Sequence, residues 1–430
     1  MRPGEARPVN GGSFEPLLLS FALAAAVVAG CGGAQAKDDG QVARSAATRV
    51  TAPQVPGDDM GALSAGNAAF AMDLYQTLRA NPGNLVFAPE SLSIALAMTY
   101  GGAAGTTAAQ MAATLHFTLP PERLHPAFDA LDLALNAQAS STGAFRLTLA
   151  NAMWAQQGFT VLPTFLDLLA QNYGAGVRLV DFASAPETVR QTINAWVAEQ
   201  TDDAVPELLK DGDISPNTRL VLANAVYFKA DWLTPFFPKS PAGTFQSPAG
   251  PVSVAMMSGP AQVPVWTGPG YTAASLPYAG GTTSMVLLVP DAGTFDAFEA
   301  ALTADTLQAA LAGAGTAALE AVMVPRFSAR QHFSVKKALA ALGMTDAFDG
   351  AAADFSGIDG RHDLFITDVI HQANVAVDEQ GTVASAATAV IVGIKGVRQT
   401  LVVDRPFLYL IRDDATGAIL FLGRVLDPSS

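Results

Sequence analysis

The sequence predicts a single α+β domain in which helices come first along the chain and strands follow. Half of the 430 residues are hydrophobic, which is enough to bury a large core. Only 14% are charged, and 38 glycines and 27 prolines favour a loop-rich mixed fold over a helical bundle. Apolar, β-prone segments gather after Thr218, and helices followed by strands are typical of antiparallel sheets with helices packed on them.

The amino-terminal end has the pattern of an export signal. Residues 17–29 read LLLSFALAAAVVA, a run too short to span a bilayer as a mature helix but typical of the core of a signal peptide. The run ends in Val28-Ala29-Gly30-Cys31, which resembles a bacterial lipobox, where the signal is cut before the cysteine and the thiol is acylated. We therefore expect a lipoprotein signal over residues 1–30 and a lipid anchor at Cys31. An ordinary signal with an incidental thiol is the alternative.

Residues 31–61 are expected to form a flexible tether, because they are rich in Gly, Ala, Asp, Pro and Gln and contain almost no large apolar residue. The folded domain would then span residues 62–430. Such a chain is expected to be exported and held on a membrane by its anchor, either in the periplasm or at the cell surface.

Helical periodicity is clear in four segments. In the first segment, Phe70, Leu74 and Leu78 fall on one face. Residues 91–100 read SLSIALAMTY and are apolar on all sides, so this helix is expected to be buried. The four helices are expected over residues 67–79, 91–100, 163–173 and 335–342.

Strands are expected where apolar, β-prone residues run between turn signals. No internal repeat and no second domain boundary follows the tether. The strands are expected over residues 145–155, 220–229, 271–277, 284–290, 318–325, 374–378, 400–403, 407–412 and 419–425.

Composition argues against several classes of function. A net charge of −14 without any basic run argues against a nucleic-acid partner. The same charge serves solubility or attracts cationic proteins. Cys31 is the only cysteine, so an intrachain disulfide and a multi-cysteine zinc site are excluded, and the five histidines form no HExxH motif. We expect no metal site and no cofactor.

Five separated segments carry a resemblance to one family, and they occur in the family's order. They are residues 84–98 (NLVFAPESLSIALAM), 193–201 (INAWVAEQT), 217–236 (NTRLVLANAVYFKADWLTPF), 324–348 (VPRFSARQHFSVKKALAALGMTDAF) and 404–428 (DRPFLYLIRDDATGAILFLGRVLDP). Over nearly all of residues 65–428 the chain resembles the serpins, which are serine protease inhibitors. The resemblance implies the serpin fold, with helices packed on three largely antiparallel sheets and an exposed reactive loop.

The resemblance also implies a mechanism. In serpins, a target protease cleaves the exposed loop, is caught as an acyl-enzyme, and is carried away when the loop inserts as a new strand of the main sheet. We therefore expect a monomeric suicide inhibitor of serine proteases and not an enzyme.

Residues 370–387 (IHQANVAVDEQGTVASAA) resemble the fifth strand of the main sheet and the hinge of a serpin. The family spacing puts the cleaved bond sixteen residues after Glu379, and counting twelve back from Phe407 gives the same residue, Lys395. The resemblance thus places the reactive bond between Lys395 and Gly396.

A lysine at the cleaved bond suits a trypsin-like protease, whose specificity pocket ends in a carboxylate. Cleavage at Ile394 or after Arg398 remains open as an alternative.

The hinge has the composition that strand insertion needs. Residues 381–394 (GTVASAATAVIVGI) contain neither charge nor proline, so alternate side chains can enter a core. One face would carry Thr382, Ala384, Ala386, Thr388, Val390 and Val392, and the other Val383, Ser385, Ala387 and Ala389. The hinge residues are Glu379, Gly381, Thr382, Val383, Ala384, Ser385, Ala386, Ala387 and Thr388.

Three polar residues match the family's cluster under the main sheet. Ser91, Asn224 and His371 are expected to form a hydrogen-bonded gate that controls strand separation, with His371 acting as a gate residue and not as a catalytic base. Trp232 matches the residue at the point where insertion begins. Ala88 stands where the family usually has Ser, which would loosen the gate.

Three other functions remain as alternatives. The nearest is a serpin fold that no longer inhibits and serves as a binding or chaperone-like protein; the small hinge residues argue against it. A secreted serine hydrolase would need a G-x-S-x-G elbow or a recognisable triad, and the sequence has neither. A surface structural protein would explain the anchor but not the hinge.

Overall fold

The computed structural model describes residues 41–141, 145–259, 262–382 and 400–430. All of them belong to one compact unit, residues 38–430. Among the described helices, none combines the length and the apolar character needed to span a membrane.

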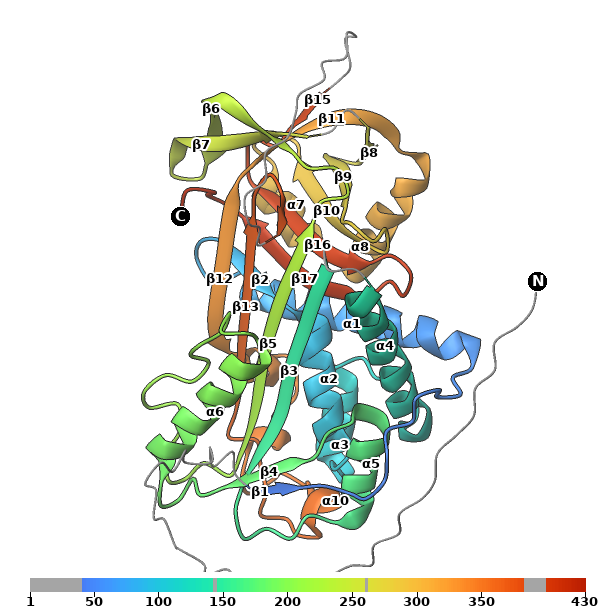
Figure 1. Ribbon diagram of the computed structural model, residues 1–430, viewed down its shortest axis with the longest axis vertical. Coiled ribbons are helices and arrows are strands. Elements are labelled where there is room, and N and C mark those ends of the chain that lie inside the picture. Colours follow the sequence, from blue (N-terminus) through green and yellow to red (C-terminus); the bar gives the residue numbers. More distant parts are fainter. Residues whose placement is uncertain (1–40, 142–144, 260–261, 383–399) are drawn as a thin grey trace, which may run out of the picture. The chain divides into compact units, whose positions relative to one another are not determined.

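A seven-stranded sheet forms the centre of this unit, and its long strands β3, β5 and β13 lie side by side (Figure 1). In spatial order its strands are β1 (Gln41–Ala43), β4 (Val177–Val180), β3 (Phe145–Gln156), β5 (Leu220–Asp231), β14 (Gly381–Thr382), β13 (Asp368–Val377) and β12 (Phe327–Ser334).

A second array of ten strands bends at β11. Residues 318–320 of β11 pair with β8, whereas residues 323–325 pair with β7, so the array divides into two sheets that share β11. With the central sheet, this gives the three sheets expected from the sequence. The array contains β2 (Leu85–Phe87), β17 (Ile419–Val425), β16 (Phe407–Asp413), β10 (Thr283–Pro290), β9 (Tyr271–Pro277), β8 (Val263–Gly268), β11 (Ala318–Pro325), β7 (Gly250–Ser258), β6 (Phe237–Ser247) and β15 (Thr400–Val402).

The helices cover both faces of the central sheet. Helix α2 lies under β3 and β5 and is buried along almost its whole length, as its apolar sequence predicts. Helix α6 lies on the opposite face (Figure 1). The helices are α1 (Gly57–Leu78), α2 (Pro89–Tyr100), α3 (Gly105–Thr114), α4 (Pro121–Ser141), α5 (Pro163–Tyr173), α6 (Pro186–Gln200), α7 (Phe295–Ala301), α8 (Ala304–Ala312), α9 (Lys336–Ala341) and α10 (Ser356–Asp359), with short 3-10 turns at Gly313–Thr316 and Asp346–Phe348.

Strand β5 separates two cores. Its even-numbered residues, such as Leu222 and Val226, face α2 and the main core, whereas Val221 and Ala223 face Trp196 of α6 in a smaller core. This alternation follows from the two-residue period of a strand. A strand placed beside β5 would likewise point alternate side chains toward the main core and toward the smaller core.

Helix α1 begins at Gly57 and not at Asn67 as predicted. Few residues before Asn67 are apolar, so hydrophobic periodicity is weak there. A polar contact replaces it, because the buried Asp59 in the first turn forms an ion pair with Arg123 of α4.

The segment before α1 also differs from the expected tether. The tether was expected to reach residue 61, but residues 41–56 lie on the domain, and residues 41–43 form strand β1 at the edge of the central sheet. Hydrogen bonds and ion pairs, which hydropathy does not reveal, hold this segment. Residues 31–40 lie outside the described part of the chain.

Candidate functional site

Strands β5 and β13 form a parallel pair along part of their length and are separated by another strand at one end. Residues Asp368–Ala373 of β13 pair with Val221–Val226 of β5. Beyond that stretch, β14 lies between them, antiparallel to both: Thr382 pairs with Ala230 of β5 and with Val377 of β13. Gly381 and Thr382, the two residues directly before residue 383, therefore already form a short strand between β5 and β13.

Trp232 lies beside this strand, and its expected role as the place where insertion begins stays a prediction. Its indole Nε1 donates to the carbonyl of Asp378 at 2.8 Å, and its backbone N–H donates to the carbonyl of Gln380 at 2.7 Å. Its ring stacks on Tyr278 with 4.5 Å between ring centroids. The Trp232 side chain and backbone thus fix the turn that leads into β14.

The two residues of β14 are closely fitted. Thr382 is fully buried, and its hydroxyl lies 2.7 Å from the hydroxyl of Tyr278. A side-chain carbon on Gly381 would lie 2.0 Å from the carbonyl oxygen of Ala230, so only glycine allows this approach. Thr382 faces the main core, as the predicted alternation of the hinge requires.

Arg326 and Glu379 form an ion pair at the base of the hinge. Arg326 lies just before β12, and its Nη2 donates to Oε1 of Glu379 at 2.6 Å. The backbone N–H of Phe236 donates to the carbonyl of Glu379 at 2.7 Å. Glu379 was singled out from the sequence, but Arg326 was not, because the partners are separated by 53 residues.

The three predicted gate residues meet beneath the sheet. Asn224 of β5 donates from Nδ2 to Oγ of Ser91 on α2 at 2.7 Å, and its Oδ1 accepts from Nδ1 of His371 on β13. Asn151 of β3 joins them: its Oδ1 accepts from Asn224 at 2.5 Å and from Ser91 at 3.2 Å. The Asn224–His371 hydrogen bond crosses from β5 to β13, so separating these strands must break it.

His371 is neutral in this arrangement. Burial lowers the pKa of His371 to about 3, with His332 as a smaller cause. Nδ1 donates to Asn224, while Nε2 accepts from the backbone N–H of Ala88 at 3.0 Å. Both ring nitrogens are thus satisfied in the neutral form, and Ala88 contributes to the gate through its backbone despite lacking a hydroxyl.

Comparison with known proteins decides the family. A family model described as Serpin (serine protease inhibitor) matches residues 65–428. The chain belongs to the serpin family. The predicted family is confirmed, and serine protease inhibition is the activity which that family description names.

Two relatives of this serpin match along their full length. The leukocyte elastase inhibitor of Bos taurus is 39% identical over 391 residues, covering 86% of this chain and 100% of the relative. The Homo sapiens protein of that name is 36% identical over 390 residues, with the same coverage.

Solved structures confirm the predicted α+β serpin fold. The thermophilic serpin tengpin in its native state has a TM-score of 0.79 at 27% identity, covering 90% of this chain and 100% of tengpin. Uncleaved ovalbumin has a TM-score of 0.75 at 25% identity, covering 86% of this chain and 100% of ovalbumin.

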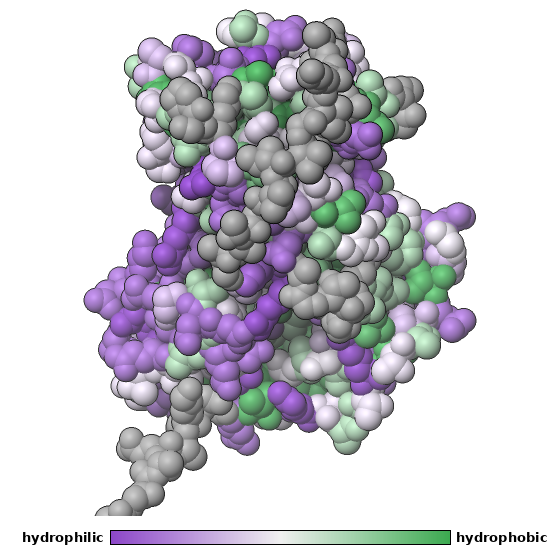
Figure 2. Space-filling model, turned by 45° about the horizontal axis from the view of Figure 1, so that its top comes forward, coloured by the Kyte–Doolittle hydropathy of each residue, from purple (hydrophilic) through white to green (hydrophobic). Residues whose placement is uncertain are grey.

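In this serpin the outer face of the β5–β13 junction is covered as well. The segment after α6 is held by Asn194, whose Oδ1 accepts from the backbone N–H groups of Leu208 and Leu209 at 3.0 and 2.7 Å. His332 of β12 contacts the Leu208 carbonyl at 2.6 Å. The surface over α6 and this segment is largely hydrophilic, at the left of Figure 2.

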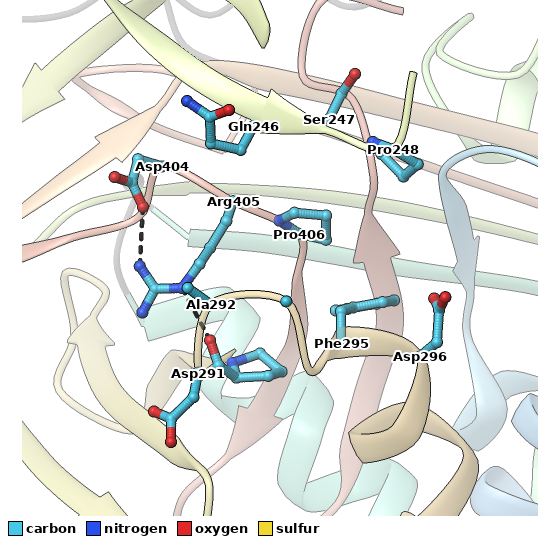
Figure 3. A pocket seen from close by; sticks show the side chains of 12 residues that line it. Gln246, Ser247, Pro248, Asp291, Ala292, Phe295, Asp296, Asp404, Arg405 and Pro406 are labelled. Atoms are coloured by element: carbon cyan, nitrogen blue, oxygen red, sulfur yellow. Dashed lines mark hydrogen bonds and ion pairs between the residues drawn. The ribbon is translucent and has the colours of Figure 1, made fainter. Parts of the chain in front are cut away.

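The far end of the loop is fixed by β15, whose residues Thr400–Val402 pair with β11, and then by Arg405. Its Nε donates to the Pro290 carbonyl at 2.9 Å and its Nη1 pairs with Asp404 at 2.8 Å, beside a cavity of about 420 Å³ (Figure 3). Both ends of the loop are therefore tied to the body of the domain.

Several predicted site residues lie outside the described part of the chain. They are the lipidation residue Cys31, the hinge residues Val383, Ala384, Ser385, Ala386, Ala387 and Thr388, and the reactive-bond residues Lys395 and Gly396. Their assigned roles stay predictions.

Proposed function

We propose that this serpin irreversibly inhibits trypsin-like serine proteases: the protease cuts the bond between Lys395 and Gly396, and the loop then inserts between β5 and β13. The observation that carries the proposal is the place of β14, which begins such a strand in an antiparallel register with both neighbours.

Continuing this register gives a specific inserted form. Thr382 pairs with Ala230, so Thr388 would stand opposite Asn224 on one side and His371 on the other. The small side chains two and four residues after Thr382 would point toward α2, because the even-numbered positions of β5 face that core. The inserted Thr388 hydroxyl would then replace the hydrogen bond that strand separation breaks.

Insertion is expected to be strongly favourable. It replaces the parallel pairing of β5 with β13 by antiparallel pairing on both sides of a new strand, which is slightly more stable for each residue. Burial of a few hundred Å² of apolar surface, at roughly 25 cal/mol per Å², adds several kcal/mol. Eleven inserted residues span roughly 36 Å, which is enough to displace a bound enzyme.

The covalent step follows ordinary acyl transfer. The protease serine oxygen attacks the Lys395 carbonyl carbon, the amide bond breaks, and the Gly396 nitrogen leaves as an amine with the transferred proton. Lys395 remains esterified to the protease. Displacement before water attacks the ester would keep that bond in place.

The relatives are named leukocyte elastase inhibitors, which points to elastase-like proteases as a second class of target. An elastase-like protease prefers a small apolar side chain in its specificity pocket, and residues 389–394 read AVIVGI. Cleavage at Ile394 would suit a chymotrypsin-like or elastase-like enzyme better than trypsin.

The deciding experiment mixes the full chain separately with trypsin and with elastase, runs a denaturing gel and sequences the released peptide. A covalent band with trypsin and a peptide that begins at Gly396 support the proposal, and Lys395→Gln should remove that band. A peptide beginning at Lys395, obtained with elastase, would reassign the specificity. Hydrolysis without any band would instead indicate a non-inhibitory, binding or chaperone-like serpin.

We also propose that the chain is exported and anchored through a lipid on Cys31, facing the periplasm or the cell surface. The support is the lipobox-like sequence that ends in the only cysteine. Fractionation of bacterial cells that express the full chain tests it. The natural chain should sediment with membranes and Cys31→Ser should not; identical fractionation of both would contradict the anchor.

A further inference from the structure

The segment before α1 is attached to the domain at several points. Gln41, Val42 and Ala43 pair with Leu179, Arg178 and Val177 of β4, at the edge of the central sheet. The Ser45 hydroxyl contacts Asp167 of α5, and the backbone N–H of Val50 donates to the Gln171 carbonyl at 2.9 Å. We call residues 41–50 the strap.

Arg49 is the most strongly bound residue of the strap. Its Nε lies 2.8 Å from Oδ1 of Asp129 and its Nη2 lies 2.6 Å from Oδ2 of Asp132, both on α4. The Asp129 side chain is fully buried, and its Oδ2 accepts no hydrogen bond from the described residues. Removing Arg49 would leave a buried carboxylate without this counter-charge, which is more costly than losing an exposed ion pair.

The backbone of the strap also fits closely against the edge of the sheet. A side-chain carbon on Gly176, just before β4, would lie 2.5 Å from the carbonyl oxygen of Ala43. Arg44, by contrast, is exposed, and the described residues provide no ion-pair partner for it. Arg49 and the pairing of β1 therefore hold the strap, whereas the charge of Arg44 does not contribute.

The strap joins elements that sheet expansion must shift relative to each other. Opening the junction between β5 and β13 moves β5 together with β3 and β4, because these three strands pair with one another. Helix α4 packs on α1 and α5 as well as on β3, so it contacts both these strands and the helices over which they would slide. The strap ties β4 to α4 and α5.

We propose that residues 41–50 act as a strap that slows expansion of the central sheet, with Arg49 as the positioning residue that anchors it. The strap then sets how long the uncleaved chain keeps its loop outside the sheet. This inference rests on the proposed function, because it concerns the barrier to the same loop insertion.

The test compares the natural full chain with Arg49→Ala and with the matched control Arg44→Ala, which removes the same charge from an exposed position. Each uncleaved protein is incubated at a fixed elevated temperature, and conversion to a urea-resistant form that no longer traps protease is followed over time. Arg49→Ala should convert roughly tenfold faster, which corresponds to an activation barrier lower by about 1.4 kcal/mol. Arg44→Ala should convert at the natural rate, and Arg49→Lys should be intermediate.

Equal conversion rates for Arg49→Ala and the natural chain, or equal acceleration by Arg44→Ala, would overturn the strap. A second measurement does not depend on inhibition: in hydrogen–deuterium exchange of the full chains, Arg49→Ala should expose the amides of β1 and β4. Unchanged exchange there also overturns the strap. Failure of the natural chain to trap any protease, with the expected exchange difference present, would count against the proposed function alone.

Discussion

Arg326 donates from both Nε and Nη2 to the same oxygen of Glu379, at 2.9 and 2.6 Å, and thereby fixes the residue from which the hinge begins. The carboxylate is nearly buried, whereas the guanidinium is about half exposed, with 10% and 48% of the side chains accessible. Replacing Arg326 and replacing Glu379 should therefore change the free energy of unfolding by different amounts.

Arg326→Ala should lower the free energy of unfolding by about 1 kcal/mol, because it leaves Glu379 buried without its counter-charge. Glu379→Gln should cost less, since the amide can still accept a hydrogen bond. The double variant should resemble Glu379→Gln. Denaturant unfolding of the four proteins measures this cycle, with Glu199→Gln as an exposed control on α6. Strictly additive effects would show that the two residues are not coupled.

Asn224→Ala should destabilise the uncleaved chain by about 3 kcal/mol, because it leaves Nδ1 of His371 without an acceptor and removes one hydrogen-bond partner from Ser91 and one from Asn151. Ser91→Ala removes fewer contacts and should cost about 1 kcal/mol. Thermal denaturation of the uncleaved proteins gives the ranking. A milder effect for Asn224→Ala than for Ser91→Ala would contradict the central place of Asn224 in the gate.

Acid should weaken the gate through His371. The folded pKa of about 3 lies below the unfolded value of about 6.5, so the unfolded chain binds more protons between these values. Stability from neutral His371 is complete above pH 6.5 and falls by up to about 1.4 kcal/mol for each pH unit below it.

Unfolding free energies at pH 7.5, 6 and 5 measure this loss, and His371→Gln should reduce the slope. Burial also lowers the pKa of His125, to about 4. His125→Gln is therefore the matched comparison, because it removes a second buried histidine whose pKa is lowered but which lies outside the gate. An unchanged slope in His371→Gln would show that other groups carry the acid sensitivity.

Thr388→Arg should convert the inhibitor into a substrate. In the continued register Thr388 enters the core between Asn224 and His371, where a guanidinium cannot be accommodated. Ser385→Arg is the control, since Ser385 would stand on the opposite face between the partly exposed Tyr227 and Asn374. The measurement is the number of inhibitor molecules consumed for each protease trapped.

That number should rise more than tenfold for Thr388→Arg and stay close to the natural value for Ser385→Arg. Equal trapping by both variants would place the inserted strand in another register or rule out insertion altogether.

The sequence predicted the strands of the hydrophobic core well because apolar runs report burial directly. The start of β13 was missed by six residues, at Asp368 instead of Asn374, because polar residues such as His371 and Gln372 interrupt the apolar pattern. Both are buried in the strand, and the His371 ring is hydrogen-bonded to Asn224 and Ala88. Strand β6 was missed because its Pro238 and Gly243 resemble turn signals, and β7 because it begins with Gly250-Pro251.

The gate could be predicted only in part. Ser91, Asn224 and His371 came from the family resemblance, whereas Asn151 did not. The sequence did contain a signal for Asn151. It lies two residues after Leu149 and four after Leu147, so a strand places all three side chains on the same, inward face of β3. Its partner, 73 residues away, could not be read from local sequence. The strap was missed for a similar reason, since ion pairs with α4 leave no hydrophobic pattern.

Thermal denaturation of the intact chain and of the chain cut once in its loop tests the central claim most directly. If loop insertion releases several kcal/mol, the cut protein should melt roughly 10 °C or more above the intact one. Equal midpoints, or a lower midpoint after cutting, would mean that the uncleaved fold stores no energy for trapping a protease.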